Sequence, residues 1–151
     1  MAYWLMKSEP TAFAWEQLAV DKRAKWDGVR NHQAANNMKA MRLGDEAFFY
    51  HSNEGLAIIG IMRITKLAYP DGSDPTGRFV MVDVAPVRAL PRPVTLREIK
   101  MDKLLQGMAL VRQSRLSVSS VTEAEWARVL ALAEKKPGPI FMSPGKEEPA
   151  E

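Results

Sequence analysis

The side chains with the clearest chemical potential are aromatic and amide groups beside the predicted ends of strands. Trp26 and Gly28 fall in a predicted loop, and the helix that follows carries Asn36 and Asn37. Such a group can bind a planar heterocycle, because the ring stacks on an aromatic side chain while its edge meets amides and backbone N–H groups. These residue types are therefore compatible with a nucleobase pocket.

A structural role explains the same residues. A tryptophan before a helix often covers the core, and asparagines often serve as helix caps and turn residues. Within residues 47–52, alternation places Phe48 and Tyr50 on one face and Phe49 on the other, as expected of a core strand. Asn37 lies at the edge of its helix's buried arc and needs a partner from the protein or from a ligand. Composition and spacing leave both interpretations open.

The sequence gives less support to metal binding, to serine hydrolysis and to phosphate binding by a glycine-rich loop. The only histidines, His32 and His51, lack the spacing of a metal motif, and no metal or cofactor is predicted. Ser8, Ser52 and Ser117 each stand near a strand end, but no GxSxG motif accompanies them. Glycine-rich phosphate loops are also absent from the sequence.

Hydrophobic periodicity and turn residues predict the elements. Asn31 is the expected N-cap of the second helix, and T-x-x-E capping boxes begin at Thr95 and Thr122. Asp83, within an apolar run, is expected to form an ion pair or backbone hydrogen bonds. Pro91 and Pro93 are expected to end the third long strand. The predicted elements are strands at residues 3–6, 47–52, 56–67 and 79–90, helices at 13–20, 31–41, from 95 and 122–135, a loop at 24–31, and short extended segments at 108–111 and 116–118.

The order of these elements predicts an α+β fold. Strands joined by short turns favour antiparallel pairing and a small, partly closed β-barrel with helices around it. The chain has 151 residues, which fits one domain, expected over residues 1–135. Residues 136–151 are rich in Pro, Gly and charge, and we expect a loose tail there.

Composition and charge limit which partners and locations are expected for this chain. The chain has no cysteine, which excludes disulfides and thiolate zinc sites. Its formal charge of +3 permits a polyanionic partner without requiring one. The sequence contains no apolar run long enough for a membrane span and no signal peptide at its start, so a cytoplasmic location and no membrane partner are expected. The oligomeric state is left undetermined.

Many short segments, in order and spacing, resemble the EVE domain family within the PUA-like superfamily. They begin with YWLMKSEP at residues 3–10 and WDGVRN at residues 26–31, and the likeness extends to about residue 130. Each segment alone is weak evidence for the family, but the order and spacing of all of them make the resemblance specific. The other matching segments are at residues 36–41, 44–45, 49–52, 59–61, 70–71, 82–84, 93–96, 99–100 and 115–118.

The resemblance implies a PUA-like fold, a small mixed β-barrel with surrounding helices, related to YTH and ASCH domains. It implies a non-enzymatic reader that binds DNA or RNA carrying a modified base such as 5-methylcytosine. By similarity to YTH readers, Trp26 would form one wall of an aromatic cage. With the residue-level argument, the candidate base-binding residues are Lys7, Ser8, Glu9, Trp26, Asp27, Gly28, Val29, Asn31, Asn37, Tyr50, His51, Ser52, Leu116 and Ser117.

Five cations are candidates for phosphate contacts: Arg30, Lys39, Arg42, Arg112 and Arg115. At three positions the sequence departs from what the resemblance leads us to expect, with His32 in place of Tyr, Ala35 in place of Arg, and Phe79 in place of Trp. Two other functions are compatible with the same pocket. One is an RNA nuclease or hydrolase of the ASCH-like kind using Lys7, Glu9, His51 or Ser52, and the other is a small-molecule or nucleotide sensor.

Overall fold

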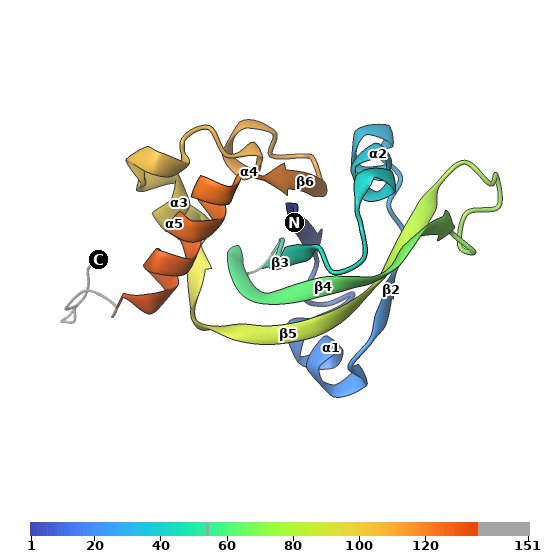
Figure 1. Ribbon diagram of the computed structural model, residues 1–151, viewed down its shortest axis with the longest axis horizontal. Helices are drawn as coiled ribbons and strands as arrows, with labels where there is room; N and C mark the ends of the chain where they lie inside the picture. The colour runs from blue at the N-terminus through green and yellow to red at the C-terminus, as the bar shows by residue number, and fades with distance from the viewer. Residues whose placement is uncertain (54, 136–151) are drawn as a thin grey trace.

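A computed structural model describes residues 1–53 and 55–135, so the predicted tail at 136–151 lies outside the described residues. Within them the chain forms six strands, five α-helices and one short 3-10 helix, which confirms the α+β class (Figure 1). The elements in chain order are β1 (Tyr3–Ser8), α1 (Trp15–Asp21), β2 (Ala24–Trp26), α2 (His32–Ala40), β3 (Glu46–His51), β4 (Ala57–Pro70), β5 (Val80–Thr95), α3 (Leu96–Met101), η1 (Lys103–Leu105), α4 (Ala109–Arg112), β6 (Val118–Val121) and α5 (Glu123–Glu134).

The six strands form one sheet in the order β2-β5-β4-β3-β1-β6. All neighbours are antiparallel, as predicted, except β1 and β3, which are parallel. A parallel pair needs a long crossover, and here α1, β2 and α2 supply it. Because β1 and β3 run the same way, Ser8 lies opposite His51 at their carboxyl ends.

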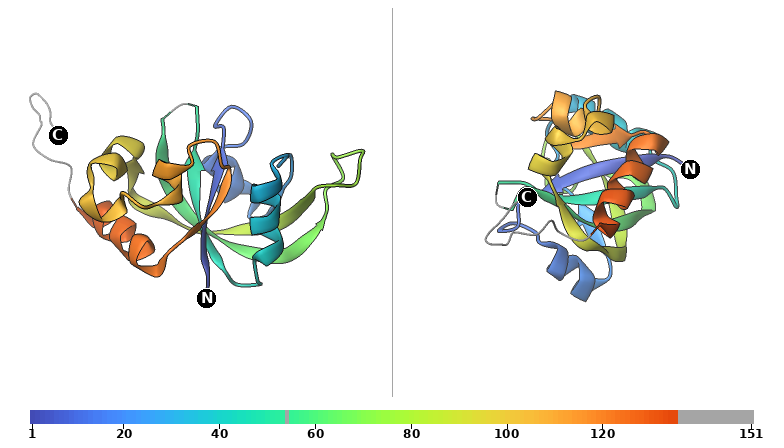
Figure 2. Two further views of the ribbon diagram at one scale, coloured as in Figure 1. Left: turned by 90° about the horizontal axis from the view of Figure 1, so that it is seen from above. Right: turned by 90° about the vertical axis from the view of Figure 1, so that its left-hand side faces the viewer.

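A closed barrel is not confirmed. Among the described residues β2 and β6 stand at opposite edges of the sheet, which remains open. The long strands β4 and β5 are strongly curved, and their hairpin projects beyond the rest of the fold (Figures 1 and 2). Several register shifts interrupt the β4–β5 ladder, and such bulges bend a strand pair without closing it.

Both faces of the sheet are buried. Along β1, Met6 faces a cluster that includes Trp15 and Trp26, while Leu5 faces a second cluster around Trp126. The predicted alternation in β3 is confirmed, because Phe49 belongs to the first cluster and Phe48 and Tyr50 to the second. Figure 2 shows helices on both sides of the sheet, which explains why nearly continuous apolar strands fold here.

Three predicted elements are wrong. Residues 24–26 were expected in a loop but form β2, an edge strand that pairs with β5. The strand β5 continues through Pro91 and Pro93, because these prolines lie between Ala89 and Val94, where the ladder with β4 is interrupted. Residues 109–112 form α4 rather than an extended segment, since a short apolar run does not separate the two states.

The local capping signals are confirmed. The Asn31 side chain accepts a hydrogen bond from Ala34 N at 2.9 Å, and both capping boxes, at Thr95 and Thr122, are formed. Asp83 was expected to meet a cation or backbone N–H groups, but its carboxylate accepts a 2.5 Å bond from the Tyr69 hydroxyl. Burial, together with this bond and the carboxylate charge, raises the pKa of Tyr69 to about 12.

No helix in the described part of the chain is long and apolar enough to cross a membrane. Residues 1–53 and 55–135 likewise hold no group of three or more His, Asp or Glu side chains placed to hold a metal ion.

Candidate functional site

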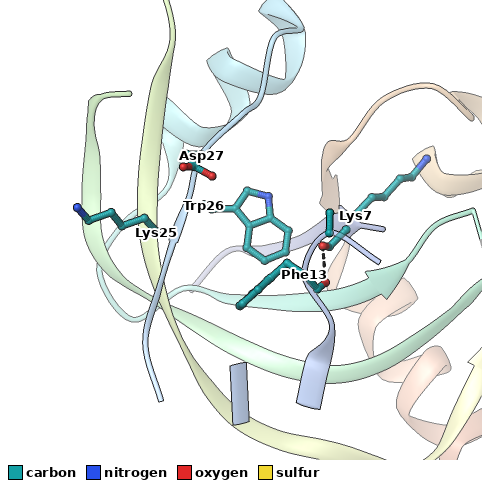
Figure 3. Close-up of a pocket in the computed structure, with 7 residues that line it drawn as sticks. Lys7, Phe13, Lys25, Trp26 and Asp27 are labelled. Atoms are coloured by element: carbon teal, nitrogen blue, oxygen red, sulfur yellow. Dashed lines mark hydrogen bonds between the residues drawn. The ribbon is translucent and has the colours of Figure 1, made fainter. Parts of the chain in front are cut away.

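A cavity of about 300 Å³ opens where β1 ends beside β2, and we call it the indole cavity (Figure 3). One side comes from the end of β1 and the turn after it, and the other from β2 and the residue that follows. The parallel β1–β3 pair and the β2–β5 edge pair hold these two sides in place. The residues that line the cavity are Lys7, Ser8, Ala12, Phe13, Lys25, Trp26 and Asp27.

Trp26 is both a core residue and a wall of this cavity. It is 6% exposed, and its ring packs edge-on against Phe13 at 6.3 Å and Phe49 at 5.5 Å between ring centres. The structural role is therefore confirmed for Trp26, and the same side chain also lines a cavity. Such packing fixes the indole before any ligand arrives, so a ring entering the cavity would meet a rigid wall.

Ser8 closes the turn that forms the cavity's second side. Its Oγ donates a 2.6 Å hydrogen bond to the Phe13 carbonyl, drawn as the dashed line in Figure 3. The Glu9 carbonyl accepts bonds from Ala12 N and Phe13 N, so Glu9 acts there through its backbone. Ser52 N donates to the Ser8 carbonyl at 2.9 Å, which ties this turn to the end of β3.

Lys7 connects the indole cavity to a second one. Its Nζ donates a 2.8 Å bond to the Ser114 carbonyl and lies 5.9 Å from the Tyr50 ring centre. Burial lowers the pKa of the Lys7 ammonium. The second cavity, of about 370 Å³, contains two of the arginines predicted to contact phosphate, and we call it the arginine cavity. Its lining residues are Asn31, Gln33, Arg112, Gln113, Ser114, Arg115 and Leu116.

Asp71, which the sequence analysis missed as a site residue, holds the loop after Trp26. Gly28 has a φ of +81°, and its N–H donates to Asp71 Oδ2 at 2.8 Å. Arg30 forms an ion pair with the same oxygen at 3.1 Å and also bonds Ser73. Arg30 is therefore already paired within the protein. The sequence signals there were the turn at residues 70–75 and the matching segment at residues 70–71, and neither reveals a partner 43 positions away.

The Asp71 carboxylate is buried and densely hydrogen-bonded. Burial alone would raise its pKa, but bonds from Ser73, Gly28 and Arg30 outweigh it and lower the pKa to about 2. The carboxylate is therefore ionised at neutral pH and anchors the Trp26–Arg30 loop to the β4–β5 hairpin.

Several predicted residues have structural partners outside the lining of the indole cavity. The Asn37 amide donates to the Val118 carbonyl at 2.7 Å. His51 Nε2 accepts from Trp15 N at 3.2 Å and so caps α1, whose own N-cap residue is alanine. Burial lowers the pKa of His51, which favours the neutral ring that this bond requires.

The remaining predicted residues divide between core and surface. Val29 and Tyr50 are buried, and burial raises the pKa of Tyr50 to about 12. Ser117 contributes its carbonyl to a 2.9 Å bond from Lys7 N. Lys39 and Arg42 are exposed on and just after α2, away from both cavities.

This architecture, an open mixed sheet with two adjoining cavities at strand and helix ends, defines a small α+β binding domain. The chain belongs to the EVE domain family, whose model matches residues 2–132.

Similar proteins occur in bacteria and animals. Thymocyte nuclear protein 1 of Mus musculus is 40% identical over 169 residues, covering 89% of this chain and 75% of that protein. The NMR structure of Rpa0253 from Rhodopseudomonas palustris is 48% identical with a TM-score of 0.83, covering 88% of this chain and 93% of that one. Human THYN1, solved in complex with 5-methylcytosine-containing DNA, is 38% identical with a TM-score of 0.86, covering 91% of this chain and all of that one.

A more distant likeness concerns the ASCH-like alternative. The ZmASCH protein from Zymomonas mobilis matches with a TM-score of 0.54 at 10% identity, covering 86% of this chain and 97% of that one, which is a likeness of fold alone.

Proposed function

We propose that this chain is a non-enzymatic reader of modified nucleobases, which binds nucleic acid by taking a base such as 5-methylcytosine into the indole cavity. The observation that carries the proposal is the rigid indole wall of Trp26 beside open space, with Lys7 and Lys25 lining the same cavity. The similarity to human THYN1, which binds 5-methylcytosine-containing DNA, supports it.

The energetics are consistent with recognition of a base that has left its stack. Extruding a paired base costs a few kcal/mol, and the cost is lowest for a base that is already unpaired. Stacking on an aromatic side chain returns roughly 1–3 kcal/mol. A buried methyl group adds about 0.8 kcal/mol, which would favour the methylated form.

The arginine cavity is suited to the backbone next to the bound base. Arg112 and Arg115 line it, and the Lys7 ammonium is bound to the carbonyl of Ser114 in the same lining. Guanidinium groups bind phosphate oxygens in a bidentate fashion. We assign the phosphate contacts to this pair rather than to Arg30, which is bound to Asp71.

Two hydrogen bonds favour a reader over the nuclease or hydrolase alternative. The Lys7 ammonium is bound to the Ser114 carbonyl, and His51 Nε2 is bound to Trp15 N. A general base needs a free lone pair within reach of its substrate. The Lys7 ammonium is protonated and has no lone pair, and the lone pair of His51 Nε2 already accepts the Trp15 N–H.

The direct test is a calorimetric titration with 5-methyl-2′-deoxycytidine and with 2′-deoxycytidine. We expect the methylated nucleoside to bind several-fold more tightly, because its extra methyl group is buried. Ala12→Trp, which adds a large ring at an exposed position of the cavity lining, should abolish binding.

Ala19→Trp is the matched control, because it adds the same side chain to an exposed site on α1 outside this lining. It should bind like the natural protein. The proposal is wrong if neither nucleoside binds, or if both tryptophan variants bind equally well. Tighter binding of a free mononucleotide than of any oligonucleotide would favour the sensor alternative.

A further inference from the structure

The side chains of Arg30, His32 and Phe79 form a layer between the start of α2 and the projecting β4–β5 hairpin. The His32 ring lies against Phe79 at 5.1 Å between ring centres, with 30° between the planes. The Arg30 guanidinium lies 5.5 Å from the centre of the same Phe79 ring. Neither ring lines the indole cavity, so the site described above does not use this layer.

Hydrogen bonds to residues of the β4–β5 hairpin hold this layer in place. Phe79 N donates to Asp74 Oδ2 at 2.8 Å, and the Phe79 carbonyl accepts from Asp71 N at 3.0 Å. Arg30 is fixed by Asp71 and Ser73. His32 is exposed, whereas Phe79 is half-buried. An exposed aromatic ring whose support is already ordered loses little entropy when a second ring stacks on it.

His32 lies next to the path that we propose for the nucleic-acid strand. Its chain neighbours Asn31 and Gln33 both line the arginine cavity, so His32 stands at the border of that cavity. A strand with one base in the indole cavity and its phosphate in the arginine cavity would bring its next base toward this border. Figure 2 shows the start of α2 and the β4–β5 hairpin side by side in the view from above.

We propose that the His32 ring, backed by Phe79, is a stacking platform for the base adjacent to the one in the indole cavity. This inference rests on the proposed function and extends it from a single base to a segment of at least two nucleotides. Stacking tolerates any base, because every base has a π-face, and so the platform would add affinity for single-stranded nucleic acid without adding sequence preference.

The test compares a nucleoside with an oligonucleotide. We would titrate His32→Ala with 5-methyl-2′-deoxycytidine and with a single-stranded DNA that carries one central 5-methylcytosine. Nucleoside affinity should remain unchanged, while oligonucleotide affinity should fall about 5- to 150-fold, the range expected for one lost base–aromatic stack. His32→Tyr should retain the oligonucleotide affinity, because a phenol ring can also stack.

Asn36→Ala is the matched control, since Asn36 is exposed one turn further along α2. 2-Aminopurine placed on either side of the 5-methylcytosine gives a second measurement. Its fluorescence should be quenched on binding at one of these positions, and His32→Ala should abolish the quenching.

Equal oligonucleotide affinity of His32→Ala and Asn36→Ala, with nucleoside binding intact, would overturn the platform and leave the base reader standing. Failure of the natural protein to bind the nucleoside would instead refute the proposed function.

Discussion

Trp26 shows how one side chain can belong to the core and also line a cavity. Its edge contacts with Phe13 and Phe49 hold the indole in the first core cluster, and the same indole lines the indole cavity. The sequence suggested Trp26 for both roles without deciding between them. The orientation of its ring depends on Phe49, which lies on a strand distant in sequence.

Asp71 gives the prediction at this scale. Asp71→Asn keeps the shape but replaces an acceptor-only carboxylate facing four donors, so it should destabilise the fold by about 1–3 kcal/mol. It should also weaken nucleoside binding, because the loop after Trp26 loses its anchor. Denaturant unfolding and calorimetry would measure the two effects, with the exposed Asp21→Asn as a control.

The contribution of the Asp71 carboxylate to the stability of the fold depends on pH in a defined direction. Its pKa in the folded state, about 2, lies below the ordinary value of 3.8, so its contribution to stability is present above pH 4 and is lost as the pH falls toward 2. The natural protein should therefore lose stability more steeply over this window than Asp71→Asn. Parallel pH curves for the two proteins would contradict this interpretation.

At the scale of elements, α1 depends on contacts that its own sequence does not supply. Its N-cap, Ala14, has no capping side chain, and His51 on β3 accepts the Trp15 N–H instead. The Trp15 ring then lies against Gly60 on β4. The apolar spacing of the sequence predicted a helix near residues 13–20. The side chain that caps the start of this helix, His51, lies on β3 and could not be predicted from that spacing.

Gly60 gives the prediction at this scale. A Cβ built there would lie 2.7–2.8 Å from three carbons of the Trp15 ring. Gly60→Ala should therefore destabilise the protein by about 1–3 kcal/mol through overpacking, measured as a shift of the denaturant midpoint. Gly107→Ala is the control, because no atom beyond its neighbours in the chain lies within 4 Å of its Cβ position. Equal midpoints for both variants would contradict the close packing of Trp15.

At the scale of the whole molecule, the sheet order brings the two cavities together. The indole cavity uses the end of β1 and β2, and the arginine cavity uses the start of α2 and residues 112–116. The bond from Lys7 to the Ser114 carbonyl joins segments 107 positions apart. With a net charge of only +3, affinity for nucleic acid must come from these local groups rather than from an extended basic surface.

Salt dependence gives the prediction at this scale. For single strands, log K falls with log salt concentration by about 0.7 per phosphate contact. Replacing both Arg112 and Arg115 by alanine should therefore reduce the slope for the methylated oligonucleotide by about 1.4 while leaving nucleoside affinity intact. Arg97→Ala, an exposed arginine on α3 outside both cavities, should leave the slope unchanged. An unchanged slope in the double variant would place the phosphates elsewhere.

The sequence by itself determined the features whose partners lie within a few residues. The Asn31 cap, the two capping boxes and the alternation within β3 were predicted because local hydrogen bonds and side-chain period fix them. The resemblance of short segments to the EVE domain added the family, whose model matches residues 2–132.

Only the tertiary structure decided the features whose partners are distant in sequence. The parallel pairing of β1 with β3, the pairing of β2 with β5, and the anchoring of Gly28 by Asp71 all join residues far apart along the chain. Short apolar or turn segments have nearly equal local preferences for several states, so long-range backbone pairing and burial select among them. For the same reason the sequence indicated Lys7, Ser8, Trp26 and Asp27 as site residues but did not indicate that Ala12, Phe13 and Lys25 line the same cavity.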